Sequence, residues 1–198
     1  MNSFGYTYWN DLYKNNETRW DIGEISPPLK AYFDQLEDRS LRILIPGCGN
    51  SYEAEYLMHH GFKDVTVIDI ADEPVKSLKK RLTAFDGKEI EIVKLDFFTY
   101  EPDGKFDLVI EQTFFCALDP ALRENYVAKM HEILRPGGKI TGVLFKTSFE
   151  KPGPPFGGTK EEYNYLFSEL FEIATLENCY NSHPKRMDNE LFIQFICR

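Results

Sequence analysis

A short loop with two glycines is the first part of this sequence that could do chemistry. Gly47, Cys48 and Gly49 come after an apolar run at residues 41–45, from which Pro46 separates them. Glycines let the backbone come close to a ligand, and the start of the helix expected next offers free N–H groups that suit a carboxylate. A tight turn alone would also explain the two glycines. The loop by itself is therefore only a weak sign of a nucleotide-like ligand.

Three acidic residues stand where the next three apolar runs end. Asp69 lies about twenty residues beyond the glycines, where a carboxylate can accept hydrogen bonds from both hydroxyls of a ribose. Asp96 could accept from the amino group of an adenine and Phe97 could cover its face, while Glu111 ends the fourth run. Each acid alone is more simply explained as a surface or capping residue. Together, ligand groups at consecutive strand ends favour a binding site.

The same spacing suits dinucleotide-binding dehydrogenases and methyltransferases. The segment from Gly47 to Ser51 lacks the third glycine of the dinucleotide fingerprint, which provides the close helix packing that a pyrophosphate needs. S-adenosylmethionine has only an amino-acid carboxylate to place there. The loop therefore favours the methyl donor over a dinucleotide.

Strands and helices are expected to alternate along most of the chain. The apolar runs predict strands at residues 41–45, 65–68, 90–93, 106–110, 139–145, 172–176 and 191–197. Helices are predicted from the capping residue Ser51 up to Gly61, and at about 73–85, 121–134 and 160–171. This alternation predicts an α/β fold of the Rossmann-like, doubly wound type with a mostly parallel seven-stranded sheet. The last two runs predict a terminal hairpin at the sheet edge, with one strand antiparallel to the rest.

The composition indicates one domain and disfavours several partners. The 198 residues fit a single domain at 1–198, with an amino-terminal helical lid at 1–38. A net charge of −9 would repel nucleic acids and anionic membranes, and no apolar run is long enough to span a bilayer. Four cysteines without framework spacing suit a reducing cytoplasm, and the amino terminus lacks a secretion signal. We expect a cytoplasmic monomer that acts on a small molecule and holds no metal, because the histidines lack ligand spacing.

Several segments, in order, carry a resemblance to a known family. They are residues 20–23 with 26–28, 45–49, 69–70, 96–99, 106–109, 114–118 and 153–156. As an ordered set they resemble the thiopurine methyltransferase family, especially its methyl halide and thiol methyltransferase branch, over most of the chain. The resemblance implies a class I methyltransferase that uses S-adenosylmethionine and releases S-adenosylhomocysteine. It also implies a set of cofactor-binding residues: Trp20, Gly47, Cys48, Gly49, Asp69, Ile70, Asp96, Phe97 and Glu111.

One position departs from both branches of that family. Thiopurine methyltransferases usually have arginine and glycine after the fourth-strand acid, where Gln112 and Thr113 stand in this sequence. The halide branch usually has an aromatic residue in place of Gln112. The sequence thus indicates a small soft acceptor and leaves open whether it is a thiol, a thiopurine-like compound or a halide.

The expected reaction asks mainly for positioning. Methyl transfer from a sulfonium is an in-line displacement, so the acceptor must lie about 3 Å from the methyl carbon. An apolar pocket favours this step for a soft anion, because opposite charges cancel in the transition state. We therefore assign no catalytic base. The expected substrate wall is Trp9, Phe114, Phe115, Pro155 and Phe156, although core packing would explain the same side chains.

Two other functions are compatible with the sequence. An O- or N-methyltransferase of a metabolite would need a base near the methyl group. A protein that binds S-adenosylmethionine without turnover would need a sealed pocket or a fixed lid. Calorimetry combined with turnover measurements separates both from a small-molecule S-methyltransferase.

Overall fold

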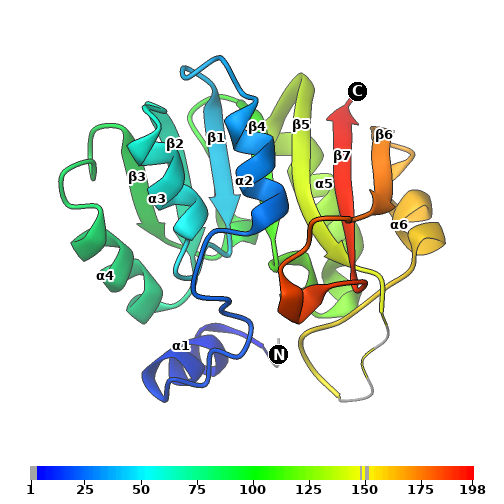
Figure 1. The fold of residues 1–198 in the computed structure, drawn as a ribbon, viewed down its shortest axis with the longest axis horizontal. Coiled ribbons are helices and arrows are strands. Elements are labelled where there is room, and N and C mark those ends of the chain that lie inside the picture. The colour runs from blue at the N-terminus through cyan, green and yellow to red at the C-terminus, as the bar shows by residue number, and fades with distance from the viewer. Residues whose placement is uncertain (1–3, 148, 150–151) are drawn as a thin grey trace.

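A seven-stranded sheet forms the middle of the molecule (Figure 1). The computed structural model describes residues 4–147, 149 and 152–198. Its strands are β1 (Arg42–Pro46), β2 (Asp64–Asp69), β3 (Ile90–Lys94), β4 (Phe106–Gln112), β5 (Leu134–Phe145), β6 (Phe171–Asn178) and β7 (Glu190–Cys197). Their order across the sheet is β3-β2-β1-β4-β5-β7-β6.

The directions of the strands confirm the predicted Rossmann-like sheet. β1 to β5 pair in parallel, whereas β7 pairs antiparallel with both β5 and β6. The predicted hairpin lies at the sheet edge, with its second strand as the inner one, next to β5. The strand order reverses between β1 and β4. In doubly wound sheets ligands bind beside this point, beyond the carboxyl ends of the strands.

The helices cover both faces of the sheet. They are α1 (Tyr6–Lys14), α2 (Pro27–Asp34), α3 (Tyr52–His59), α4 (Asp72–Arg81), α5 (Arg123–Ile133) and α6 (Lys160–Phe167). α2, α3 and α4 contribute to one core cluster, and α5 and α6 to the other. Ile43 and Ile45 belong to the first cluster and Leu44 to the second, which is the alternation of a strand buried on both faces. Among the described residues no helix is long and apolar enough to cross a membrane.

Three predicted boundaries differ from the structure by four residues or more, and one of them is the end of α4, which lies at Arg81 and not near residue 85. The helix predicted at 160–171 ends at Phe167, because β6 already begins at Phe171. β5 begins at Leu134, well before the predicted start, since Leu134 pairs with Phe106. Residues 135–138, which precede the predicted start, are thus part of that strand, which is irregular there.

Two segments far apart in the sequence lie beyond the edge of the sheet where the parallel strands end. α1 lies below this edge in Figure 1, and so do residues 152–158, which lie between β5 and α6 in the sequence. α1 packs against α4, and α2 packs against α3. The amino-terminal part of the chain is therefore helical, as predicted, and α1 stands over the expected ligand-binding edge.

Candidate active site

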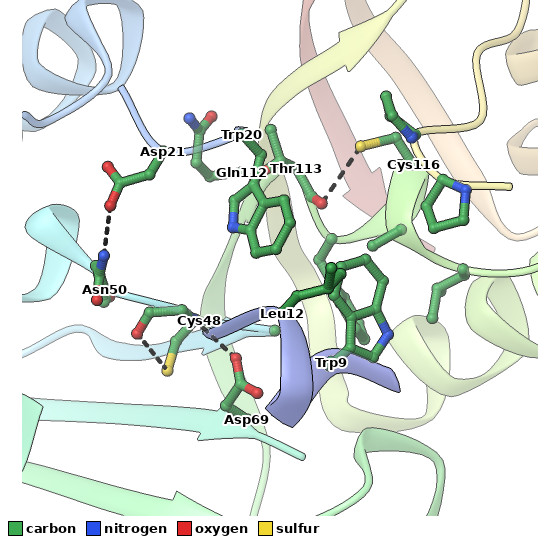
Figure 2. A pocket seen from close by; sticks show the side chains of 18 of the residues that line it. Trp9, Leu12, Trp20, Asp21, Cys48, Asn50, Asp69, Gln112, Thr113 and Cys116 are labelled. Carbon is green, nitrogen blue, oxygen red and sulfur yellow. Dashed lines mark hydrogen bonds between the residues drawn. The ribbon is translucent and has the colours of Figure 1, made fainter. Parts of the chain in front are cut away.

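A cavity of about 750 Å³ opens at this edge of the sheet. What we call the cofactor half is formed by lining residues within 47–53, 68–70 and 95–98, which follow β1, β2 and β3. The acceptor half is formed by lining residues within 112–118, 145–155 and 185–189, from the end of β4 onward. The N-terminal segment, residues 4–24, contributes further lining residues, of which Figure 2 labels four.

The loop after β1 is bent by two glycines in the left-handed region. φ is +55° at Gly47 and +52° at Gly49. A side chain at Gly47 would collide with the ring of Phe114, and a Cβ at Gly49 would lie 2.6 Å from the Tyr13 hydroxyl. Two aromatic side chains thus come close to the backbone at these glycines, and the predicted approach of a ligand to the same loop stays a prediction.

Asp69, at the end of β2, fixes this loop through its carboxylate. Oδ2 accepts a hydrogen bond from Gly49 N and Oδ1 accepts one from Ala71 N, both at 2.8 Å. The side chain is buried, and this burial raises the pKa of Asp69 to about 6. Each carboxylate oxygen has a second lone pair, so the group can also accept two hydroxyls from a ligand.

Two buried polar atoms of the lining have no hydrogen-bond partner within the part of the chain that the structure describes. They are Ser51 Oγ, just before α3, and Gln112 Oε1, at the end of β4. Ser51 occupies the predicted N-cap position of α3, but it adopts φ +43° and its side chain makes no capping hydrogen bond. Buried polar atoms without partners cost stability, and a polar ligand would satisfy them.

The turn after β3 brings Asp96 and Phe97 into the cavity lining. Asp96 Oδ1 accepts a hydrogen bond from Phe98 N at 3.0 Å and so caps the short helical turn Phe97–Thr99. The Phe97 ring meets Phe114 edge-on, with 5.3 Å between ring centroids. Asp96 thus has a capping role, and its second oxygen is still able to accept from a ligand.

The cofactor half offers groups that match the parts of S-adenosylmethionine. The loop backbone and the start of α3 suit its amino-acid end, near the unpaired Ser51 Oγ. The Asp69 carboxylate suits a ribose, and the Asp96 carboxylate suits an adenine amino group. The residues present therefore fit the cofactor that the sequence indicates.

Glu111 is completely buried and is not among the cavity-lining residues, which corrects the predicted contact with a cofactor. Oε1 accepts from Phe114 N at 2.8 Å and from Phe115 N at 2.9 Å, and Oε2 accepts from the Tyr126 hydroxyl at 2.6 Å. Burial raises the pKa of Glu111 to about 7. The carboxylate therefore supports the turn after β4, and its contact with the cavity is indirect.

Aromatic rings of the N-terminal segment follow one another along the cavity. Trp9 meets Trp20 edge-on with 5.4 Å between ring centroids, and Tyr13 meets Trp20 at 5.5 Å. All three line the cavity, and Figure 2 shows the two indole rings side by side. The predicted site residues Trp9 and Trp20 are thus brought together. Tyr13 is a lining residue that no sequence motif indicated.

Asp21 joins the N-terminal segment to the loop after β1. Its Oδ2 accepts a hydrogen bond from Asn50 Nδ2 (Figure 2). The same oxygen accepts one from the Tyr52 hydroxyl at 3.3 Å. Its Oδ1 accepts from Gly23 N at 2.7 Å. Asn50 and Tyr52 were not predicted as site residues, because their partner lies in a distant part of the sequence.

The five predicted substrate residues separate into two groups. Trp9, Phe114 and Pro155 line the cavity, whereas Phe115 and Phe156 do not. The helical turn Phe115–Ala117 sends neighbouring side chains in different directions, and this separates Phe114 from Phe115.

Phe115 belongs to the core under α5 and α6. It is completely buried, meets Tyr126 at 5.0 Å between ring centroids, and lies 5.0 Å from the guanidinium of Arg123. Phe156 acts through its backbone, because its N–H donates to Cys116 O at 2.7 Å. Both predicted contacts with substrate are therefore corrected to supporting roles.

A buried cation reaches the acceptor half from the connection between β6 and β7. Arg186 Nη1 lies 3.3 Å from Glu190 Oε1, and Nη2 donates to Trp20 O. Its guanidinium also lies over the Phe145 ring, at 5.8 Å from the centroid. Lys185 lines the cavity as well, and its Nζ has no partner among the described residues. The sequence alone did not single out either cation as a site residue.

Cys116 lines the acceptor half without being an activated nucleophile. Its Sγ donates to Thr113 O at 3.3 Å, and burial raises the pKa of the thiol. No group of three or more His, Cys, Asp or Glu side chains in the described ranges could hold a metal ion. The described lining thus provides groups that bind and position a ligand.

The sequence matches a known family over nearly its full length. Residues 5–192 match thiopurine S-methyltransferase. Probable thiol methyltransferase 2 of Arabidopsis thaliana is 31% identical over 187 residues, which cover 93% of this chain and 78% of that protein. Thiocyanate methyltransferase 1 of Brassica oleracea is 28% identical, with 85% and 75% covered. Thiopurine S-methyltransferase of Vibrio parahaemolyticus is also 28% identical, with 90% and 89% covered.

Solved structures share the fold at low sequence identity. The Burkholderia thailandensis 1,6-didemethyltoxoflavin-N1-methyltransferase, crystallised with S-adenosylhomocysteine, has a TM-score of 0.78 at 19% identity and covers 96% of this chain and 86% of its own. A TehB-like S-adenosylmethionine-dependent methyltransferase from Corynebacterium glutamicum has a TM-score of 0.70 at 17% identity, with 97% and 95% covered. Both carry the class I methyltransferase fold.

Proposed function

The chain belongs to the thiopurine S-methyltransferase family and is an S-adenosylmethionine-dependent methyltransferase, and from this premise we propose that its acceptor is a small soft anion such as a thiolate. The cofactor supplies an electrophilic methyl group on a sulfonium sulfur. Relatives named for thiols, thiocyanate and thiopurines support this class of acceptor. A halide belongs to the same class, because it is also a soft anion.

The charge of the acceptor half is the observation that carries the proposal. Its described lining residues include aromatic rings, prolines and the cations Lys185 and Arg186, but no carboxylate or imidazole. The described lining residues of this half thus offer no carboxylate or imidazole to remove a proton from an alcohol or amine. An anion, in contrast, needs no base and is attracted by Lys185, and also by Arg186, whose charge is partly balanced by Glu190.

We propose the following roles for the cavity residues. Asp69 accepts the ribose hydroxyls, and Gly47, Cys48 and Gly49 hold the amino-acid end of the cofactor. Ile70, Asp96 and Phe97 surround the adenine, and Trp20 closes over the cofactor. Trp9, Phe114 and Pro155 exclude water from the acceptor, so the chain contributes positioning rather than a catalytic base.

The pH dependence of turnover with different acceptors tests the proposal. Labelled S-adenosylmethionine is incubated with iodide, thiocyanate and thiols of graded acidity, and kcat/KM is measured across neutral pH. We expect a flat profile for iodide, which has no proton to lose, and a profile for each thiol that rises up to the pKa of that thiol. The proposal would be overturned if only amines or alcohols were methylated. It would also be overturned if kcat/KM rose over the same pH range for every thiol, whatever the pKa of that thiol. Cofactor binding without any product would indicate a binding protein instead.

We also propose that residues 1–38 act as a lid on a single domain, and that the protein is a cytoplasmic monomer that acts without nucleic acid. The four cysteines are free and buried, which suits a reducing compartment. The large hydrophobic side chains that are most exposed lie apart in the chain, Tyr165 in α6 and Tyr180 in the turn after β6. Light scattering on the purified protein tests the monomer, and a dimer would contradict it.

A further inference from the structure

Asn10 is the only buried residue of α1, with 2% of its surface exposed. Its Oδ1 accepts hydrogen bonds from Asp72 N at 3.0 Å and from Glu73 N at 3.3 Å. These are the first two residues of α4. Asn10 therefore caps α4 from a helix that lies 62 residues earlier in the chain.

α4 has no cap of its own. Its N-cap residue is Ala71, which has no side-chain oxygen. The backbone there, with φ −87° and ψ 142°, has the extended form that N-cap residues usually adopt. The free N–H groups at the start of a helix need a partner, and in this chain the partner comes from α1.

The capped turn adjoins the cofactor half on one side and the lid on the other. Ala71 N donates to Asp69 Oδ1, and Asp69 Oδ2 holds Gly49 N. On the other side, α1 carries Trp9 and Tyr13, both of which line the cavity. The two hydrogen bonds of the cap thus connect α1 to Asp72 and Glu73, which follow Asp69 by three and four positions.

The remaining polar contact between α1 and α4 lies at the surface. The Tyr6 hydroxyl donates to Asp72 Oδ2 at 2.6 Å, and the Tyr6 side chain is 39% exposed. An exposed hydrogen bond contributes little, because water competes for both partners. Asn10 is therefore the buried polar anchor between the two helices.

We propose that Asn10 is a positioning residue for cofactor binding, which docks α1 over the cofactor half by capping α4. The inference rests on the proposed function only in taking this half as the site of S-adenosylmethionine. Because the same hydrogen bonds make the cap and the docking contact, α1 can leave the cavity only when α4 loses its cap. Trp9 and Tyr13 are held over the site by this coupling.

Tryptophan fluorescence offers a direct measurement of docking. The chain has two tryptophans, Trp9 and Trp20, and both line the cavity from the N-terminal segment. We expect Asn10→Ala to raise the Kd of S-adenosylhomocysteine about tenfold and to expose both indoles to quenching by acrylamide. The KM for S-adenosylmethionine should rise more than kcat falls. Asn10→Asp, which keeps a capping oxygen, should restore binding and protection from quenching.

Ala71→Ser, added to Asn10→Ala, separates docking from capping. Serine supplies α4 with a local cap, so the double variant should recover thermal stability while its Kd and quenching stay at the Asn10→Ala values. Recovery of the Kd together with stability would overturn the proposal, since Asn10 would then act only as a cap. Wild-type Kd and quenching in Asn10→Ala would overturn it too. If Asn10→Ala does not fold, the Kd and the quenching of the double variant are compared with those of the wild type, and wild-type values would again overturn the proposal.

Tyr6→Phe is the matched control. It removes the exposed hydrogen bond between the same two helices and leaves the cap intact, so the Kd should stay within about twofold of wild type. These binding measurements need no acceptor. Failure of the proposed function would appear as missing methylated product, whereas failure of this inference would appear as an unchanged Kd.

Discussion

The cofactor half of the cavity is built from backbone groups and acids at three strand ends, whereas the acceptor half is built from rings, prolines and two cations. The first half uses adjacent strands, β1, β2 and β3, which follow one another in the chain. The second brings together the turn after β4, the loop after β5 and the connection before β7. A shared cofactor can thus be held by a compact set of segments, while the acceptor pocket draws on segments that can vary separately.

The largest expected effect is the loss of cofactor binding in Asp69→Asn. The amide turns an N–H group toward either Gly49 N or Ala71 N, and it weakens acceptance from a ribose. Since hydrogen bonds to a charged group contribute about 1.5–3 kcal/mol each, the Kd of S-adenosylhomocysteine should rise at least about 100-fold by calorimetry. Asp64→Asn, at the exposed other end of β2, is the control. An equal effect in both variants would contradict the assignment of the cofactor half.

Glu111→Gln should change stability with pH and leave the cofactor half intact. Burial raises the pKa of this carboxyl from 4.5 to about 7, so its contribution to stability is complete below pH 4.5 and is lost as the pH rises through about 7. In the wild-type protein the free energy of unfolding should fall by at most about 3 kcal/mol over this pH range. Glu111→Gln should not show this fall. Denaturant unfolding at several pH values measures this. A large rise in the Kd of the cofactor would instead restore Glu111 as a ligand-binding residue.

Cofactor binding should itself weaken in acid. The pKa of Asp69 is raised from 3.8 to about 6, and ribose hydroxyls bind the charged carboxylate best. As the pH falls below about 6, binding must displace a proton, so the Kd should rise by up to about tenfold per pH unit. Calorimetry in buffers of different pH measures the slope. Asp69→Asn should show no such slope, and a slope that persists in this variant would assign the effect to another group.

Gln112→Leu should produce the smallest change, and only in the acceptor half. Its Oε1 is buried without a hydrogen-bond partner among the described residues, so an acceptor with an N–H group beside the sulfur can donate to it. The variant should lose about fivefold in kcat/KM for a thiopurine relative to iodide, and the Kd of the cofactor should not change. Competition between the two acceptors measures this ratio. An unchanged ratio would place Gln112 away from the acceptor.

The sequence predicted the sheet and most of the cofactor half because both depend on local signals. Asp69 and Asp96 line the cavity and were identified in the sequence because they stand at the end of an apolar strand and just after the next one. The same rule misplaced Glu111, because position at a strand end does not specify which way the side chain points. Phe114 and Phe115 show the same limit, since neighbours in a helical turn face different surroundings.

The remaining site residues depend on contacts between distant parts of the chain. Arg186 bonds Trp20 across 166 positions, and Asn10 caps α4 across 62. Neither residue belongs to a motif, and no periodicity indicates its partner. Ala71 was the one available signal, because a helix start without a capping side chain suggests that a cap comes from elsewhere.

The place of β7 between β5 and β6 affects the order in which the protein can fold during synthesis. β6 is made before β7, but it pairs only with β7 and so cannot join the sheet until residues 190–197 have left the ribosome. Glu190, the partner of Arg186, belongs to the same late strand. Strands β1 to β4, in contrast, can pair while the rest of the chain is still being made. The cofactor half therefore has the opportunity to form first, and the acceptor half is completed last.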